Sequence, residues 1–314
     1  MCLLFVLVNP KGLESSTTYK IIIAHNRDEY FTRPSVPAEF QTEHSVFGLD
    51  ITKGKEGGTW LGLSTSGRFG ALLNAHDVWT SSKSVPSTER PLKGRGRIVV
   101  EFLQNNEVSL DSYVKSLSDQ KKQYNPFIFV GLQPQLDNNT DKLSGSSGET
   151  VIDWKLAYFN SGSESSEFLS PGIYGFGNTE RHGPYRKVLY GLQRFQQSVV
   201  THSLESDSRE MLISDLFQML SDQTRSWPDQ RLDKFRSDIP VTLRQALSSC
   251  FVVTPTSVGY GTRASTVILI DRDNHVTFVE KSMSTSVDDL GRAVLDPSKD
   301  WTVKRHEFSL DIRN

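Results

Sequence analysis

The residue with the clearest chemical potential is Cys2, which lies one position from the start of the chain. Removal of Met1 would leave a thiol and a free α-amine on the same residue. A thiol has an ordinary pKa of roughly 8.5 and an α-amine one of roughly 7.7 to 8.0, so near neutral pH the amine can accept the thiol proton. Cys2 is therefore a candidate nucleophile with its own base. The alternative interpretation is a small buried residue that opens a first strand.

Four further motifs place polar side chains beside glycines or at strand ends. They are Asn26-Arg27-Asp28-Glu29, Gly57-Gly58-Thr59-Trp60-Leu61-Gly62, Tyr174-Gly175-Phe176-Gly177-Asn178 and Gly259-Tyr260-Gly261-Thr262-Arg263. Taken singly, each motif has a structural explanation, because glycine allows positive φ, asparagine tolerates turns, and arginine often pairs with aspartate on a surface. Only their combination and order point to a site.

A cluster of cations, Lys93, Arg95 and Arg97, lies just ahead of an expected helix. At a helix N-terminus such a cluster can hold a carboxylate, a propionate or a phosphate. A solvated cap on a surface loop explains the same residues equally well. Both interpretations stay open at this point.

Composition limits the classes of function. A chain of 314 residues with 36% hydrophobic residues can bury a substantial core. The formal net charge of -2 gives no global attraction for nucleic acid or anionic membrane. Two cysteines are too few for a disulfide framework or a cysteine-rich zinc site. We expect a soluble globular protein without a structural or catalytic metal.

Targeting signals are weak throughout the sequence. The apolar stretch from Met1 to Val8 is not preceded by basic residues and ends at Asn9-Pro10, which is untypical of a secretory signal. No apolar run reaches the roughly 18 residues that a membrane span needs. We expect a cytosolic protein without a stable membrane span.

Hydrophobic periodicity predicts strands that follow one another as hairpins. Expected strands are Leu3–Val8, Tyr19–His25, Thr59–Ser64, Arg68–Asn74, Phe127–Gly131, Val151–Tyr158, Ser249–Val253, Ser265–Ile270 and Val276–Glu280. Turns are expected at Ser66-Gly67 and Asp273-Asn274, and a loop around Pro34 and Pro37.

Expected helices are Ile98–Leu103, Val108–Leu117, Val188–Val200 and Met211–Leu220. Two blocks of helices bracketed by antiparallel strands predict an α+β fold with stacked sheets inside and helices outside. Residues 138–149 are rich in serine, glycine and asparagine and are expected to form a mobile insertion in a single domain over residues 1–314.

Taken together, the order of these motifs resembles the family of transport and Golgi organisation protein 2, also called the NRDE family after its tetrapeptide. The resemblance rests on Cys2, on the NRDE tetrapeptide from Asn26 to Glu29, on the GKEGGTWLG stretch at residues 54–62 and on the GYGTR stretch at residues 259–263. It runs from Met1 to the final strand near Phe308, with residues 138–149 as the least familiar part.

That family in turn is similar to the N-terminal-nucleophile hydrolases that use cysteine, such as bile salt and penicillin V amidases. The resemblance implies a four-layer αββα sandwich. It also implies that Cys2 is nucleophile and base and that Asp28 holds its amine. Asn74 and Asn178 would supply oxyanion donors, and Arg263 would lie beside the nucleophile.

One position departs from the amidase pattern, in which arginine is followed by asparagine, one further residue and aspartate. Here the order is His25, Asn26, Arg27 and Asp28, so Asn26 and Asp28 align while the arginine has moved by one residue. Because one residue along a strand changes the face, Arg27 is expected to point away from Cys2.

The resemblance further implies Golgi organisation, intracellular handling of haem, and links to mitochondria and to lipid or acyl-CoA metabolism. Two functions of different class follow. The first is a carrier that shelters an amphipathic anion, haem or an acyl-CoA-like molecule, in an amidase-like cleft. The second is a hydrolase of amides or thioesters that works through a Cys2 acyl-enzyme. The residues expected around a ligand are Asn26, Arg27, Glu29, Trp60, His76, Arg95 and Arg97.

Overall fold

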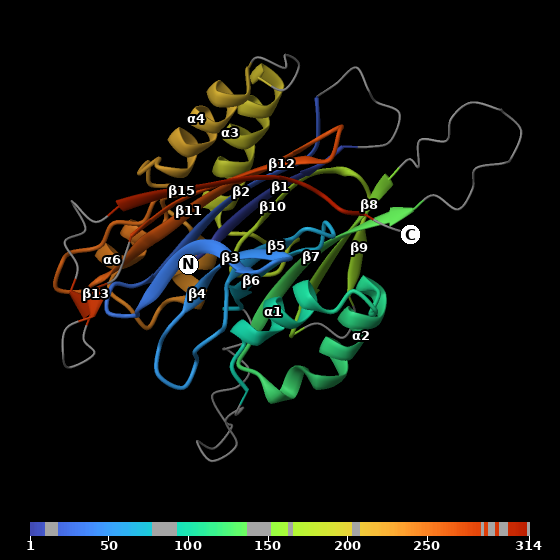
Figure 1. Cartoon of the computed structure of the whole chain (residues 1–314). Helices are drawn as coiled ribbons and strands as arrows, with labels where there is room; N and C mark the ends of the chain where they lie inside the picture. The colour runs from blue at the N-terminus through green and yellow to red at the C-terminus, as the bar shows by residue number, and fades with distance from the viewer. Residues whose placement is uncertain are drawn as a thin grey trace, which may run out of the picture.

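A computed structural model of the chain describes residues 1–9, 18–76, 93–136, 152–162, 166–202, 208–283, 286–287, 293–294 and 301–312. Its strands form two large antiparallel sheets, and helices lie on both sides of them (Figure 1). The predicted α+β class is confirmed. The insertion expected at residues 138–149 lies outside the described residues. Within the described ranges, no helix is both long and apolar enough to cross a bilayer.

The first sheet has six strands in the order β10-β1-β2-β11-β12-β15. Their bounds are β1 (Leu3–Val8), β2 (Tyr19–Tyr30), β10 (Gly172–Phe176), β11 (Tyr260–Asp271), β12 (His275–Met283) and β15 (Trp301–Ser309). Central strands are covered on both faces, which explains their continuous apolar runs. β2 continues past the predicted end at His25 because its last residues pair with β11, so the NRDE tetrapeptide lies within a strand.

The second sheet has seven strands in the order β3-β4-β5-β6-β7-β8-β9. Their bounds are β3 (Ser35–Thr42), β4 (Ser45–Asp50), β5 (Leu61–Ser64), β6 (Phe69–Asn74), β7 (Phe127–Leu136), β8 (Ile152–Asn160) and β9 (Glu167–Leu169). The prediction of a loop around Pro37 was wrong, because β3 runs through this residue. Its position at the edge of the sheet explains this, since an edge strand tolerates a residue without an N–H donor.

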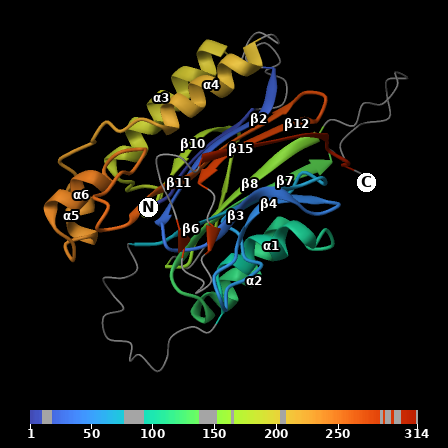
Figure 2. The same ribbon diagram turned by 60° about the vertical axis from the view of Figure 1, so that its left-hand side comes forward.

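The longer helices cover the outer faces of the sheets. α1 (Gly96–Gln104) and α2 (Leu110–Gln120) pack on the second sheet through a cluster of aromatic and aliphatic side chains. α3 (Arg186–His202) and α4 (Arg209–Leu220) pack on the first sheet. Figure 2 shows these two pairs on opposite sides of the sheets, with the short helices α5 (Gln230–Phe235) and α6 (Val241–Leu247) beyond α3 and α4.

Smaller elements complete the described chain. They are a 3₁₀ turn at Lys121–Gln123 and a two-stranded ribbon of β13 (Ser286–Val287) and β14 (Ala293–Val294). The predicted strand at Ser249–Val253 was wrong, because this segment makes only an isolated bridge between Val253 and Gly261. Its apolar residues pack instead under the helices α3 and α4, which is why the pattern looked strand-like.

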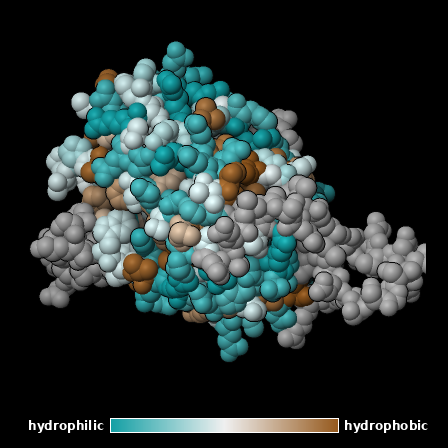
Figure 3. All heavy atoms as spheres, turned by 90° about the horizontal axis from the view of Figure 1, so that it is seen from above, coloured by the Kyte–Doolittle hydropathy of each residue, from teal (hydrophilic) through white to brown (hydrophobic). Residues whose placement is uncertain are grey.

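The largest core lies between the two sheets. It joins alternate residues of strands from both, such as Leu4 and Ile23 of the first sheet with Leu63 and Val130 of the second. The face of the molecule drawn in Figure 3 is mostly hydrophilic, with small, separate hydrophobic groups among the coloured residues. Exposed apolar side chains on α3 and α4 include Leu189, Val200 and Met211.

Candidate functional site

The pairing of β1 with β2 decides which residues surround Cys2. Leu3 pairs with Asn26 and Leu4 with His25 in an antiparallel register. Continued by one and two residues, this register puts Cys2 opposite Arg27 and Met1 opposite Asp28. Residues directly opposite each other in an antiparallel pair point to the same face. Arg27 therefore shares the face of Cys2, and the expectation that it points away was wrong.

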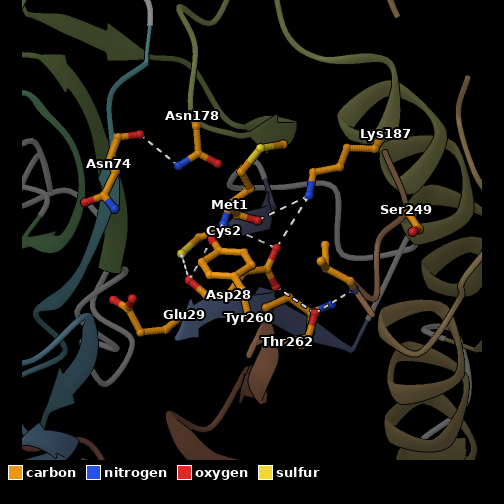
Figure 4. A network of polar contacts seen from close by, with 12 residues as sticks. Met1, Cys2, Asp28, Glu29, Asn74, Asn178, Lys187, Ser249, Tyr260 and Thr262 are labelled. Carbon is orange, nitrogen blue, oxygen red and sulfur yellow. Dashed lines mark hydrogen bonds and ion pairs between the residues drawn. The ribbon is translucent and has the colours of Figure 1, made fainter. Parts of the chain in front are cut away.

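The N-terminal amine of Met1 is buried in a polar network (Figure 4). It lies 3.5 Å from Asp28 Oδ2 and donates a hydrogen bond to the Tyr260 hydroxyl. Lys187 Nζ lies 3.6 Å from the same Asp28 oxygen and donates to the Met1 carbonyl oxygen over 3.2 Å. The Thr262 hydroxyl donates to Asp28 Oδ1 over 2.6 Å. Asp28 thus contacts the amine of Met1, whereas the resemblance implies contact with a freed amine of Cys2.

The Cys2 thiol lies on the opposite side of the backbone from Lys187 (Figure 4). It is 7% exposed, and its sulfur lies 4.0 Å from the backbone oxygen of Asp28. Burial raises the pKa of the thiol, and the nearby N-terminal amine and Arg27 oppose this shift. In this form of the chain the nitrogen of Cys2 is part of a peptide bond, so the residue has no base of its own.

Cys2 opens into a cavity of about 370 Å³ between the ends of the two sheets and the segment before α1. Of the predicted ligand-binding and catalytic residues, it is lined by Cys2, Arg27, Asp28, Glu29, Trp60, Asn74, Arg95 and Arg97. Lys55, Lys93 and Arg33 add further cations. None of the described residues that line it is a histidine.

Two arginines bring positive charge into this cavity, and the carboxylates of Glu29 and Asp50 lie near enough to act on the Arg27 charge. The guanidinium of Arg27 stacks on the Trp60 ring at 3.8 Å and donates to the Ser35 hydroxyl over 3.1 Å. Arg95 donates to the carbonyl oxygen of Pro126 over 2.7 Å. Within the described part of the chain, neither guanidinium forms an ion pair. Burial lowers the pKa of both, since the charge has lost much of its hydration.

Glu29 lines the cavity and forms an ion pair with Arg33. Its carboxylate lies 2.8 Å from Arg33 Nη1, and Arg33 Nη2 lies 2.5 Å from Asp50 Oδ2. Arg33 therefore balances two carboxylates. The coulombic effect of Arg33 and Arg27 lowers the pKa of Glu29 although burial raises it. Glu29 remains charged at neutral pH and limits the positive potential on this side of the cavity.

Asn74 and Asn178, which the resemblance implies as oxyanion donors, differ in their contacts. Asn74 lines the cavity and its side chain is exposed, so its amide can reach a bound molecule. Asn178 donates its amide nitrogen to the Asn74 backbone oxygen over 2.8 Å (Figure 4). One of the two N–H groups of that amide therefore holds the end of β6, and Asn178 is not among the residues that line the cavity.

Arg263 does not line the cavity. It is 1% exposed, and its Nη1 donates to the backbone oxygen of Tyr30, over 3.1 Å, and to that of Arg33. The register shift between Thr262 and Ala264 is a bulge at this residue, which turns the side chain toward those carbonyls. Burial lowers its pKa to about 10. Through these hydrogen bonds Arg263 holds the end of β2 and the turn that follows it.

Asn26 lies on the other face of β2 from Cys2. Its amide nitrogen donates to the backbone oxygens of Leu220, over 2.7 Å, and Cys250, over 3.0 Å, and its oxygen accepts from Ser265 over 2.6 Å. These bonds tie β2 to the end of α4 and to β11. The predicted contact of Asn26 with a ligand is not supported by this placement.

His76 also lies outside the cavity lining. Its Nδ1 lies 3.0 Å from the Tyr185 hydroxyl, and its backbone N–H donates to the Asn178 oxygen over 2.7 Å. Burial lowers the pKa of His76 well below its ordinary value. Its backbone contact places it among the supports of Asn178, and it has no contact with the cavity that would bind a ligand.

Backbone packing positions the cationic segment before α1. The Thr59 N–H donates to the Gly96 oxygen over 3.1 Å. A Cβ atom on Gly96 would lie 2.8 Å from the Gly58 Cα, so only glycine allows this approach. The glycines of the GKEGGTWLG stretch therefore bring Arg95 to the rim of the cavity.

Sequence reasoning missed Lys187, Tyr260 and Thr262 as parts of the site. Lys187 stands in a stretch with many basic residues, and nothing in its neighbours distinguishes it. Tyr260 and Thr262 lie on either side of Gly261 in the GYGTR stretch, of which only Arg263 was predicted to be a site residue. The alternation of β11 was a usable signal, because residues 260 and 262 share one face of the strand.

Comparison with known proteins now defines the family. The family model described as Transport and Golgi organisation 2 matches residues 1–285. The Transport and Golgi organization protein 2 homolog of Bos taurus is 34% identical over 312 residues, covering 99% of both chains. That of Homo sapiens is 33% identical with the same coverage, and the Drosophila melanogaster protein is 30% identical over 321 residues.

A similarity to a solved structure is weaker. The crystal structure of a mutant conjugated bile acid hydrolase from Clostridium perfringens is 10% identical in sequence and covers 98% of this chain and 97% of its own. Its TM-score is 0.34, which is too low to support an argument about fold or function.

Proposed function

The chain belongs to the Transport and Golgi organisation 2 family, and from this premise we propose that it binds an amphipathic anionic small molecule in the Cys2 cavity and carries it inside the cell. Haem and acyl-CoA-like thioesters are the candidate ligands. The cytoplasm, with association to the Golgi and mitochondria, is the proposed place of action. The names of the family and of its relatives support the link to the Golgi alone.

The observation that carries this proposal is that the guanidinium groups of Arg27 and Arg95 face the cavity and form no ion pair with any other residue that the structure describes. Arg27 and Arg95 can each bind a carboxylate, a propionate or a phosphate by charge-assisted hydrogen bonds. The Trp60 ring beside Arg27 supplies an apolar wall. Cys2 is the soft donor that a haem iron would meet, since the lining among described residues holds no histidine.

Ligand titration tests the carrier. Titration of the purified protein with haem, followed by absorbance, and with a long-chain acyl-CoA, followed by calorimetry, should show saturation near one equivalent for at least one of them. Arg95→Ala should weaken binding about 10- to 100-fold, since a hydrogen bond to a charged group contributes roughly 1.5 to 3 kcal/mol. The additional change Arg97→Ala should add little, because Arg97 is exposed.

The matched control is Arg225→Ala, which removes an exposed arginine outside the cavity lining. Its isotherm should equal that of the parent protein. Absence of saturation with both ligands, or equal affinities of the Arg95 and Arg225 variants, would contradict the carrier.

A second candidate function is hydrolysis of an amide or thioester, and the placement of Cys2 favours it. The thiol faces the cavity while the N-terminal amine lies beside Asp28. After removal of Met1, the sulfur would attack the acyl carbonyl carbon and its proton would pass to the Cys2 amine. Asn74 would donate to the oxyanion, and the leaving amine or thiolate would take the proton back. Water would then hydrolyse the acyl-cysteine.

This candidate includes the four-layer αββα arrangement of the N-terminal-nucleophile hydrolases. The packing of α3 and α4 on one sheet and of α1 and α2 on the other supports it. Intact-mass measurement of the purified protein shows whether Met1 is removed, and retention of Met1 would end the proposed mechanism. If Met1 is absent, acyl substrates should turn over faster with the parent than with Cys2→Ala. Equal rates would contradict catalysis by this thiol.

A further inference from the structure

Lys187 is a buried cation at the N-terminal amine, close to the nucleophile of the hydrolase candidate. Its side chain is 1% exposed and enters the network from the first turn of α3 (Figure 4). Burial of a lysine ammonium costs free energy unless charged or hydrogen-bonding groups lie beside it. Here the partners are the Met1 carbonyl oxygen at 3.2 Å and Asp28 Oδ2 at 3.6 Å.

The amine needs such a cation if it is to accept a proton. A carboxylate beside an amine stabilises its ammonium form, and an ammonium cannot take the proton of the thiol. Asp28 Oδ2 lies 3.5 Å from the Met1 amine of the present chain, one residue before the Cys2 nitrogen, and would act in this unfavourable direction alone. With Lys187 at nearly the same distance from the same oxygen, the pair of side chains has no net charge.

We propose that Lys187 is a positioning residue for the Cys2 nucleophile, which neutralises Asp28 and keeps the α-amine that Met1 removal would free in its proton-accepting form. This inference rests on the hydrolase candidate. Lys187 acts through the amine and through Asp28, and it lies on the far side of the backbone from the Cys2 sulfur (Figure 4).

The geometry gives an upper limit for the distance between Lys187 Nζ and the Cys2 nitrogen, which is the amine that Met1 removal would free. The nitrogen of Cys2 is bonded to the carbonyl carbon whose oxygen accepts from Lys187 Nζ over 3.2 Å. With ordinary bond lengths, the nitrogen lies within about 6 Å of that ammonium. At such a distance a like charge disfavours the protonated amine.

The groups around the present amine act in the same sense. Burial lowers the pKa of the Met1 amine, and Lys187 lowers it further. Asp28, Cys2 and Glu29 raise it, with Asp28 as the largest of the three. Tyr260 faces the amine from β11 as a neutral hydroxyl, since burial raises its pKa well above the ordinary value. Lys187 is thus a charged group whose effect on the amine opposes that of Asp28.

The experiment measures protonation of the amine directly. A fusion whose protease leaves Cys2 as the first residue gives the matured chain, and ¹³C-cysteine labelling gives two signals, from Cys2 and Cys250. Cys250→Ala assigns them. The ¹³Cα shift of Cys2 is then followed from pH 5 to 10. We expect a midpoint below the ordinary range of roughly 7.7 to 8.0, and a rise of at least about one pH unit in Lys187→Met.

Three further variants separate charge from packing. Lys187→Gln, a second neutral variant in case Lys187→Met does not fold, should give the same rise. Lys187→Arg keeps the charge and should keep the parent midpoint within about half a unit. Asp28→Asn should move the midpoint down, opposite to the lysine variants. Folding of each is checked by its amide NMR spectrum.

A parent midpoint at or above the ordinary range, or neutral Lys187 variants that titrate like the parent, would overturn the assignment. Turnover is measured separately on the same samples. An inactive parent with the expected shifts would contradict the hydrolase candidate and support the effect of Lys187 on the amine. An active parent whose midpoint is insensitive to Lys187 would contradict the assignment alone.

Discussion

Burial of the single side chain His25 makes the free energy of unfolding depend on pH. It is 0% exposed on the inner face of β2, and neither ring nitrogen has a hydrogen-bond partner among the described residues. Burial, with the nearby Arg27 charge as a smaller cause, lowers its pKa to about 3. The folded protein therefore holds a neutral imidazole at pH values where the unfolded chain binds a proton.

The sign of the pH effect follows from proton linkage. Between pH 6.5 and about 3 the unfolded state binds more protons at His25, so the free energy of unfolding should fall as pH falls. Each pKa unit corresponds to about 1.4 kcal/mol, which puts the upper limit for this residue at roughly 4 to 5 kcal/mol. Urea denaturation in steps from pH 7 to 4 should show a shallower loss for His25→Leu than for the parent.

His44→Gln is the control for this measurement, because His44 is exposed. It should leave the pH dependence unchanged. Parallel stability curves for the parent and His25→Leu would contradict the assignment of acid sensitivity to His25.

At the scale of elements, the start of α1 and the loop before β5 are held together by direct contact of their backbones. Gly58 and Gly96 approach so closely that a Cβ on Gly96 would lie 2.8 Å from the Gly58 Cα. Backbone atoms cannot move aside as the end of a flexible side chain can. The position of Arg95 over the cavity therefore depends on a glycine in the next residue.

Gly96→Ala should destabilise the protein and weaken ligand binding together. Insertion of a methyl group into a packed contact typically costs about 1 to 3 kcal/mol, more than the gain of up to about 1 kcal/mol from replacing glycine in a helix. Urea denaturation gives the free energy of unfolding, and the titration described above gives the affinity.

Gly94→Ala is a matched control two residues away, since no atom lies within 4 Å of a Cβ built there. Its stability should stay within about 0.5 kcal/mol of the parent value; the comparison uses stability alone, because Gly94 itself lines the cavity. Equal behaviour of the two alanine variants would show that the contact does not position the cationic segment.

For the whole molecule, the shared core between the sheets predicts one cooperative unit. Side chains from both sheets belong to the same cluster, and a buried Glu280 of β12 accepts a hydrogen bond from the Ala38 N–H of β3 over 2.8 Å. Separate unfolding of either sheet would expose this core and break that bond. The prediction of a single domain over residues 1–314 has this consequence in solution.

Urea unfolding followed by tryptophan fluorescence and by far-UV circular dichroism should give the same midpoint within about 0.2 M, as expected for a two-state transition. Trp60 and Trp154 report on the second sheet and Trp227 and Trp301 lie on the side of the first. Single-tryptophan variants therefore resolve the two halves. Midpoints that differ between the halves would indicate two independent units.

The pattern of neighbouring residues in the sequence was enough to predict several strands, turns and helices of this protein. The apolar run of β1, the hairpin at Ser66-Gly67 and the helical spacing of α1 and α3 are properties of neighbouring residues, and the structure has each of them. The motifs also identified the family, because their order along the chain needs no third dimension. Prolines misled the prediction at β3, where only the position at the sheet edge makes a strand acceptable.

Tertiary structure decided the faces and partners. Arg27 lies beside Cys2 because two strands pair in one register, and a shift by one residue would have reversed this. The Asn178 amide bonds to the backbone oxygen of Asn74 across 104 residues, and Lys187 bonds to that of Met1 across 186. Contacts between residues so distant in sequence leave no local pattern, since they arise only when sheets and helices pack. The sequence alone could therefore identify candidates for the site, while packing determined what each of them contacts.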